Sequence, residues 1–153
     1  MVVYDSADLD SAAESVVDAI WFNQGQVCSA GSKLLVQEPI YDKFVDKLKK
    51  RLERGFRIGE RNHLFKSPFP PKIYCCVSIL GTSLDKTYDM GAIVSQSQLK
   101  SIAAYVDEAK EDGADVFQIA TPEGCYYPPT IITNVSTASR VCAVKKNCAS
   151  SIP

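Results

Sequence analysis

The chain has 153 residues, a length that suits one compact domain of about 150 residues. Its 17 lysines and arginines are balanced by 18 aspartates and glutamates, so the formal net charge of −1 leaves no excess positive charge for binding nucleic acid. The mean hydropathy is −0.06, and no apolar run approaches the roughly 20 residues that span a bilayer, so the sequence indicates neither a membrane protein nor a disordered one.

The first elements expected are a short strand and a helix. Residues 2–4 indicate a short buried strand. Apolar residues then recur at helical spacing from Leu9 to Ile20, with Asp8 placed as the N-cap. We expect this helix to end near Asn23.

A turn of small residues, a strand and a second helix are expected next. Gly25 and Gly31 flank the turn, and residues 32–37 have the length and apolar content of a partly buried strand. Pro39 then opens a helix whose leucines point inward. The basic run at 47–51 is expected on the solvated face of that helix.

The third helix has the clearest boundaries. Ser95 and Gln98 stand in the capping-box spacing before its first apolar residues, and Gly113 supplies a left-handed stop. Strands are expected at 115–119 and 130–135, where β-branched residues are frequent. Strands that alternate with helices in this way predict an α/β architecture.

Two stretches do not fit this pattern. Residues 61–83 contain three prolines and have neither helical nor strand periodicity, so they are expected to form an irregular insertion. Residues 141–153 are expected to form a disordered tail.

The cysteines are expected to be free thiols. Residues 1–8 show no basic start and no long apolar core, so we predict no secretory signal and a cytoplasmic location, where disulfides are rare. His63 is the only histidine, and Cys75 and Cys76 are adjacent rather than spaced as Cys-x-x-Cys. We therefore expect no metal site.

The segment from Trp21 to Ser32 carries the strongest candidate for chemistry. Cys28 lies just beyond a predicted helix end, between two glycines that allow a ligand to approach the backbone closely. A lone cysteine is more often a small buried hydrophobic residue, so spacing alone does not make Cys28 a nucleophile.

The order Trp-Phe-Asn-Gln-Gly-Gln-Val-Cys at 21–28 resembles the active-site signature of the aldehyde dehydrogenase superfamily. Residues 5–10 and 31–37, which flank it, and residues 89–94 and 127–132, which follow later, are similar to further segments of that family in the same order. Residues 116–118 and 125–139 resemble the divergent sixteenth family of vertebrate aldehyde dehydrogenases.

The resemblance implies a fold and a reaction. The fold is a partial aldehyde dehydrogenase catalytic domain, a Rossmann-like α/β unit with helices packed on a largely parallel sheet. The reaction is oxidation of a small-molecule aldehyde to a carboxylate with NAD or NADP as acceptor. Cys28 would attack the carbonyl to form a thiohemiacetal and then a thioester, and its backbone N–H would donate to the oxyanion. A homo-oligomer is implied for the full-length form, with no nucleic-acid or membrane partner.

Gln98 matches a family position near the nicotinamide ribose, which makes it the candidate cofactor-binding residue. Its place in the capping box is a sufficient structural explanation and is the favoured one. No Gly-x-Gly-x-x-Gly occurs in the chain, so the main dinucleotide-binding domain is expected to be missing.

The departures from the family pattern indicate a fragment. Residues 1–60 and 84–140 are interpreted as two catalytic-domain segments, separated by the insertion 61–83 and followed by the tail 141–153. The family's glutamate base and its oxyanion asparagine have no counterpart here, so the chain is expected to be inactive alone. Trp21 stands where the family usually has a smaller apolar residue, and it either narrows a pocket or belongs to the core.

Two alternatives differ in class. The chain could be a non-catalytic scaffold or subunit partner that resembles aldehyde dehydrogenases. A small cysteine hydrolase that pairs Cys28 with His63 is disfavoured, because His63 lies in the irregular insertion and no third orienting group is identified. The open strand edges left by a partial domain predict that the isolated chain is aggregation-prone or only partly folded.

Overall fold

A computed structural model of the chain describes residues 1–55, 89–121, 123–135, 139 and 141. The predicted irregular insertion at 61–83 lies outside the described residues, and so does the predicted tail apart from Val141. His63 and four of the six cysteines also fall outside them.

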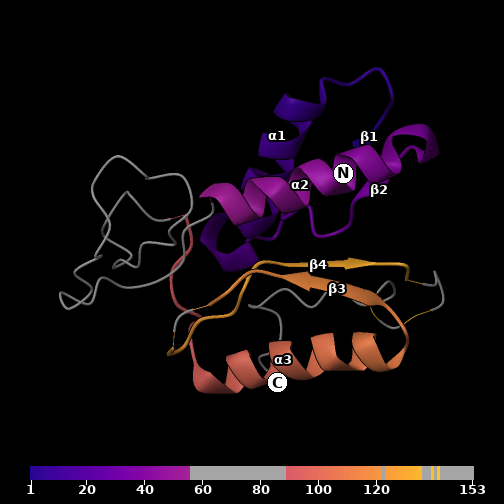
Figure 1. Cartoon of the computed structure of the whole chain (residues 1–153). Coiled ribbons are helices and arrows are strands. Elements are labelled where there is room, and N and C mark those ends of the chain that lie inside the picture. The colour runs from indigo at the N-terminus through magenta and orange to yellow at the C-terminus, as the bar shows by residue number, and fades with distance from the viewer. Residues whose placement is uncertain (56–88, 122, 136–138, 140, 142–153) are drawn as a thin grey trace, which may run out of the picture.

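The described elements form layers around a small sheet (Figure 1). Helices α1 (Leu9–Trp21) and α2 (Tyr41–Gly55) pack against each other on one side of strands β3 (Asp115–Gln118) and β4 (Thr130–Thr133). Helix α3 (Gln96–Glu111) lies on the other side. Helices on both sides of a sheet agree with the predicted α/β class.

A second, parallel pair of strands lies beside α1 and α2. Strand β1 (Val2–Val3) pairs with β2 (Leu35–Val36), with Val2 opposite Leu35. The backbone N–H of Leu35 donates to the carbonyl of Met1 at 2.9 Å, and that of Gln37 donates to the carbonyl of Val3 at 3.0 Å. The β1–α1–β2 order is the unit from which parallel sheets are built.

These two strands are shorter and more exposed than the sequence indicates. The strand expected over 32–37 is reduced to Leu35–Val36, and the side chains of Val2 and Leu35 are 55% and 66% exposed. Within the described residues, β1 and β2 pair only with each other, so neither strand is extended by a further partner. Val3 is buried in the core, and Val36 is partly buried against it.

Strands β3 and β4 are antiparallel, so one pair in the structure is parallel and the other is not. Phe117 and Ile131 lie opposite each other and pack against the core formed with α1 and α2. Their neighbours Val116 and Ile132 are also paired, and by strand alternation they face the α3 side.

The helix boundaries follow local capping signals. Asp8 caps α1 by accepting from the backbone N–H of Ser11 at 3.1 Å, and α1 ends at Trp21, close to the predicted end at Asn23. Ser95 caps α3 by accepting from the backbone N–H of Gln98 at 3.2 Å. Gly113 follows α3 with φ of +84°, the left-handed conformation expected of a C-terminal glycine.

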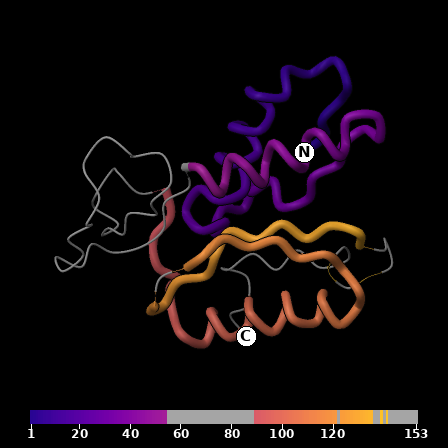
Figure 2. The backbone as a smooth tube through the Cα atoms, in the orientation of Figure 1, coloured from indigo at the N-terminus to yellow at the C-terminus, as the bar shows by residue number. Residues whose placement is uncertain are grey.

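Helix α2 supplies much of the core. Phe44, Leu48 and Leu52 are buried on one face, as the helical spacing predicts. Pro39 lies in a short 3-10 turn, η2 (Glu38–Ile40), that leads directly into α2. Figure 2 shows α2 crossing in front of α1, with both helices on the side of β3 and β4 opposite α3.

The basic run of α2 is solvated but also makes contacts. Lys47 forms an ion pair with Asp10, and Arg51 forms one with Glu14, so both residues connect α2 to α1.

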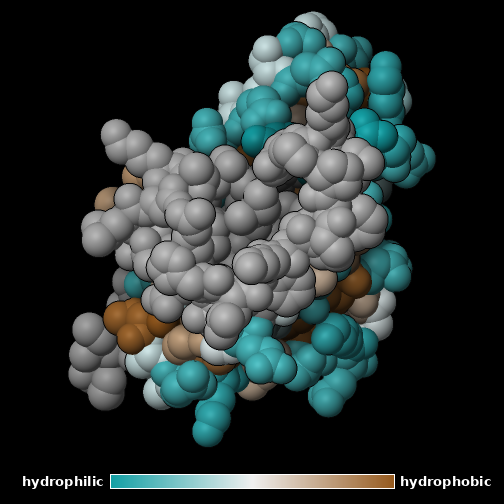
Figure 3. Space-filling view, turned by 60° about the vertical axis from the view of Figure 1, so that its left-hand side comes forward, coloured by the Kyte–Doolittle hydropathy of each residue, from teal (hydrophilic) through white to brown (hydrophobic). Residues whose placement is uncertain are grey.

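On the side shown in Figure 3, the described surface is mostly hydrophilic. No helix in the described part of the chain combines the length and the apolar character needed to cross a bilayer.

Candidate active site

A left-handed turn connects α1 to Cys28. The 3-10 segment η1 (Phe22–Gly25) follows α1 directly, and Asn23, Gln24 and Gly25 have φ values of 51°, 56° and 73°. Glycine and asparagine adopt this conformation readily, whereas a residue such as glutamine loses about 1–2 kcal/mol there. The strained position at Gln24 therefore needs contacts that compensate for it.

Backbone hydrogen bonds shape the chain around Cys28. The N–H of Gln26 donates to the carbonyl of Asn23 at 2.9 Å, and Asn23 Nδ2 donates back to the carbonyl of Gln26 at 3.3 Å. The N–H of Ala30 donates to the carbonyl of Val27 at 3.0 Å, which closes a turn with Cys28 at its tip. The side chain of Cys28 is exposed, and a reactant from solvent can reach it.

Cys28 and Cys125, the cysteines of the described part, are both thiols rather than disulfide partners, as predicted for them. They differ in exposure, because Cys28 is exposed and Cys125 is half-buried. Cys125 therefore provides an internal reference for the reactivity of Cys28.

Gln98 lies in the first turn of α3 and is half-buried. Its backbone N–H is used in the cap with Ser95, which confirms the predicted capping contact from Ser95. The capping contact involves the backbone of Gln98, and the side-chain amide is a separate group that can hydrogen-bond elsewhere.

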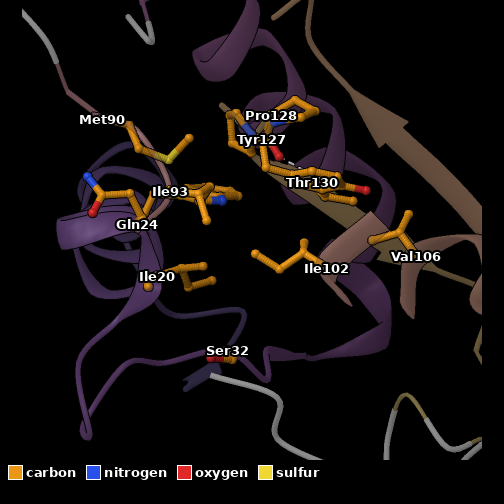
Figure 4. Close-up of a pocket in the computed structure, with 13 residues that line it drawn as sticks. Ile20, Gln24, Ser32, Met90, Ile93, Ile102, Val106, Tyr127, Pro128 and Thr130 are labelled. Carbon is orange, nitrogen blue, oxygen red and sulfur yellow. Dashed lines mark hydrogen bonds between the residues drawn. The ribbon is translucent and has the colours of Figure 1, made fainter. Parts of the chain in front are cut away.

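A cavity of about 190 Å³ lies between the end of α1, α3 and the chain before β4 (Figure 4). The side chains of Ile20 and Ile102 point toward one another across it. Neither Cys28 nor Gln98 lines this cavity, so the two candidate residues do not converge there. The lining is mainly apolar, and its residues are Ile20, Trp21, Gln24, Gly25, Ser32, Met90, Ile93, Ile102, Val106, Tyr127, Pro128, Pro129 and Thr130.

Trp21 satisfies both interpretations made from the sequence. Its side chain is buried at 7% exposure within the core cluster, and it also lines the cavity. A large aromatic residue at this position therefore fills the core and limits the cavity volume.

Polar groups at one wall of the cavity form a small network. Gln118 Nε2 donates to the hydroxyl of Tyr127 at 3.2 Å and to Thr130 Oγ1 at 3.0 Å. Burial raises the pKa of the Tyr127 phenol, and the hydrogen bond with Gln118 opposes that effect. Tyr127 is therefore a neutral hydrogen-bonding group at physiological pH.

Sequence reasoning did not identify Gln24, Tyr127 or Thr130 as site residues. The asparagine and glycine that flank Gln24 are the only local signal for its left-handed conformation. The cavity is formed by residues that are distant in the sequence, so no local pattern points to it.

No group of three or more potential metal ligands occurs among the residues that the structure describes.

Comparison with known proteins gives a consistent result. Residues 1–144 match the Aldehyde dehydrogenase family. The chain is 34% identical to aldehyde dehydrogenase (NAD(P)+) 2 of Saccharomyces cerevisiae over 146 residues, which are 92% of this chain and 25% of that protein. It is 30% identical to a probable betaine aldehyde dehydrogenase of Schizosaccharomyces pombe, covering 92% of this chain and 24% of that protein.

Solved structures agree with this match and with the predicted partial α/β fold. Betaine aldehyde dehydrogenase from Staphylococcus aureus, in complex with NAD+, superposes with a TM-score of 0.74 at 28% identity, over 96% of this chain and 26% of that one. The aldehyde dehydrogenase KauB from Pseudomonas aeruginosa gives a TM-score of 0.72 at 31% identity, over 96% and 26%. The chain thus spans about a quarter of the length of the relatives it matches.

Proposed function

Because the chain belongs to the aldehyde dehydrogenase family, we propose that it supplies the nucleophile segment for NAD(P)-dependent oxidation of a small-molecule aldehyde to a carboxylate, with Cys28 as the nucleophile. The observation that carries this proposal is the exposed thiol of Cys28 at the tip of a hydrogen-bonded turn. An exposed thiol on a fixed backbone is accessible to a carbonyl carbon and keeps a constant approach direction.

The proposed chemistry begins at the Cys28 sulfur. The thiolate attacks the carbonyl carbon, so a sulfur–carbon bond forms and the carbonyl π electrons move to oxygen. The backbone N–H of Cys28 donates to that oxygen, which is then protonated to give a thiohemiacetal. Removal of a hydride from the former carbonyl carbon, together with loss of the hydroxyl proton to solvent, would leave a thioester. Water would then add to the thioester, releasing the carboxylate and a proton and restoring the thiol.

NAD(P)+, when bound, would supply the acceptor for this hydride. Gln98 would hold a small part of that cofactor. The residue is half-buried, and the cap of α3 uses its backbone N–H rather than its side-chain amide. In this proposal the Gln98 amide bonds a ribose hydroxyl. The sequence contains no glycine-rich dinucleotide fingerprint, so the phosphates require residues outside this chain.

We further propose that residues 1–60 and 84–140 act as two segments of one catalytic domain and are inactive without the remainder of such an enzyme. The family's base and dinucleotide domain would have to come from elsewhere in a longer, homo-oligomeric form. The alternative is a non-catalytic partner subunit, and the exposed strands β1 and β2 are the feature that favours it.

The test begins with the native polypeptide, captured from its source with an antibody against residues 95–113. Its intact mass is compared with the 16.8 kDa of this chain, and NAD(P)H formation is followed by absorbance with small aldehydes. We expect a longer chain whose activity is lost in Cys28→Ser and retained in Cys125→Ser. A longer chain without thiol-dependent NAD(P)+ reduction would overturn the proposal, and a native 16.8 kDa species would favour the partner alternative.

A further inference from the structure

Gln24 connects the turn before Cys28 to a distant part of the chain. When its side-chain amide is oriented so that both of its groups are satisfied, Nε2 donates to the carbonyl of Asn23 at 3.1 Å. In the same orientation Oε1 accepts from the backbone N–H of Gly91 at 3.0 Å. One side chain therefore bonds both to its own turn and to the segment at 89–93.

The segment that receives Gln24 is itself anchored. Met90 and Ile93, on either side of Gly91, are each 5% exposed, and the backbone N–H of Ile93 donates to the carbonyl of Cys125 at 2.7 Å. Figure 4 shows the Gln24 amide on the Met90 side of the cavity, directed away from the cavity centre. The hydrogen bond from Gly91 thus connects the turn to a fixed point in the core.

This contact explains why a glutamine adopts a left-handed conformation. Gln24 has φ of 56° and ψ of 26°, a backbone conformation that is unfavourable for residues with a Cβ atom. Its contacts with Asn23 and Gly91 compensate for that cost, and the next residues lead to the Val27–Ala30 turn. Cys28 lies four positions after Gln24 along the backbone.

We propose that Gln24 is a positioning residue for Cys28, because its hydrogen bond with Gly91 fixes the turn that directs the Cys28 backbone N–H at the carbonyl of a bound aldehyde. The inference rests on the proposed function. Gln24 itself touches neither the aldehyde nor the reacting sulfur in this scheme.

Two substitutions separate the contact from the backbone conformation. Gln24→Ala removes the contact and keeps the disfavoured left-handed position, whereas Gln24→Gly removes the contact and makes that position favourable. Gln24→Gly therefore retains the fold even where Gln24→Ala does not. Gln96→Ala is the matched control, since Gln96 is an exposed glutamine at the start of α3.

Two readouts are made on the whole 153-residue chain, in its monomeric fraction. Hydrogen exchange of the Gly91 amide reports the contact. Capture of propanal is measured as the propanal concentration that half-protects Cys28 from alkylation, with Cys125 as the internal reference. Alkylation without propanal is recorded in parallel, because general unfolding changes it at both cysteines.

In both Gln24 variants we expect about fivefold faster exchange at Gly91 and an about fivefold higher half-protecting propanal concentration at Cys28, the effect of losing one hydrogen bond. Gln96→Ala should change neither. If Gln24→Gly matches the unsubstituted chain, or if exchange rises without any change in propanal capture, the positioning role is wrong. Equal protection of Cys28 and Cys125 in the unsubstituted chain would also overturn the positioning role, because the Cys28 turn would then capture no aldehyde on its own. The proposed function is decided separately, by NAD(P)H formation in the longer chain.

Discussion

The backbone N–H of Gly31 donates to the carbonyl of Ala19 at 2.9 Å, so the chain leaving Cys28 returns to the last turn of α1. A Cβ atom at position 31 would lie 2.9 Å from Cγ and Sδ of Met1 and 3.4 Å from Cβ of Ala19. A side chain at position 31 would therefore displace the flexible end of Met1, whereas its distance to Ala19 is an ordinary van der Waals contact. The glycine that the backbone requires is Gly25, which adopts the left-handed conformation at the start of the Cys28 turn.

Replacing Gly25 by alanine should destabilise the fold by more than the left-handed backbone conformation alone would cost. Its Cβ would meet the backbone carbonyl oxygen of Ile20 at 3.2 Å, and φ is +73°. We expect Gly25→Ala to lower the free energy of unfolding by about 2 kcal/mol in urea titration. Gly113→Ala is the control, since φ there is +84° with open space around the site, and it should cost about 1 kcal/mol. Equal losses would show that the Ile20 contact is unimportant.

Phe44 should be the most sensitive apolar residue of α2. Its side chain has no exposed area and lies in the core between α1 and α2. Because truncation leaves a cavity, we expect Phe44→Ala to lower the free energy of unfolding by about 4 kcal/mol. Phe22 is the same residue type at 70% exposure, so Phe22→Ala should change it by less than about 0.5 kcal/mol. A similar loss in both variants would contradict the assigned core.

The Asp8 cap predicts an acid-sensitive stability. The side-chain and backbone hydrogen bonds from Ser11 lower the pKa of Asp8 below its usual value of 3.8. Because the folded-state pKa is lowered, the carboxylate stabilises the folded chain fully above the unfolded pKa, and this contribution is lost as pH falls through the folded value. Asp8→Ala should therefore lower the thermal midpoint at neutral pH, by an amount that shrinks as the pH falls below 3.8.

Asp8→Asn provides the comparison for that experiment. Asparagine keeps an acceptor for Ser11 but does not titrate, so it should retain most of the neutral-pH midpoint. A difference between the unsubstituted chain and Asp8→Ala that stays constant into the acid range would show that the Asp8 carboxylate is not the titrating group.

The ion pair between Arg51 and Glu14 should contribute a small and salt-dependent coupling between α1 and α2. The hydrogen bond with Glu14 raises the pKa of Arg51, so the guanidinium stays charged throughout the physiological range. A double-mutant cycle with Arg51→Ala and Glu14→Ala should give about 0.5 kcal/mol at low salt. The coupling should nearly vanish at about 1 M salt, where the Debye length is about 3 Å. A coupling that persists at that salt concentration would mean that the pair is more shielded from solvent than its exposure indicates.

Local signals predicted the helices well. Asp8 and Ser95 were identifiable as N-caps, and Gly113 as a stop, because each acts through contacts with residues a few positions away. The apolar spacing of Phe44 and Leu48 likewise identified the buried face of α2.

The short strands and the turn were harder to predict because they depend on distant partners. The length of β2 is set by its pairing with β1, and the left-handed conformation of Gln24 is accompanied by a bond from Gly91. Neither relationship leaves a periodic pattern in the sequence. Cys28 stands out through its resemblance to a family signature, and its role as the nucleophile remains a prediction.

The pairing of β1 with β2 has a consequence for the kinetics of Cys28. The amino group of Met1 donates a hydrogen bond to the carbonyl of Lys33, 32 positions away. The strand hydrogen bonds beside it join the two ends of a loop that contains α1 and Cys28. Closing a loop of this length removes much of its conformational freedom. Local opening of β1 would free the two ends of that loop, but α1 would stay packed on α2, and the hydrogen bond from Gly31 to Ala19 would still hold the turn. Cys28 would therefore keep its orientation toward solvent for longer than the β1–β2 bonds last.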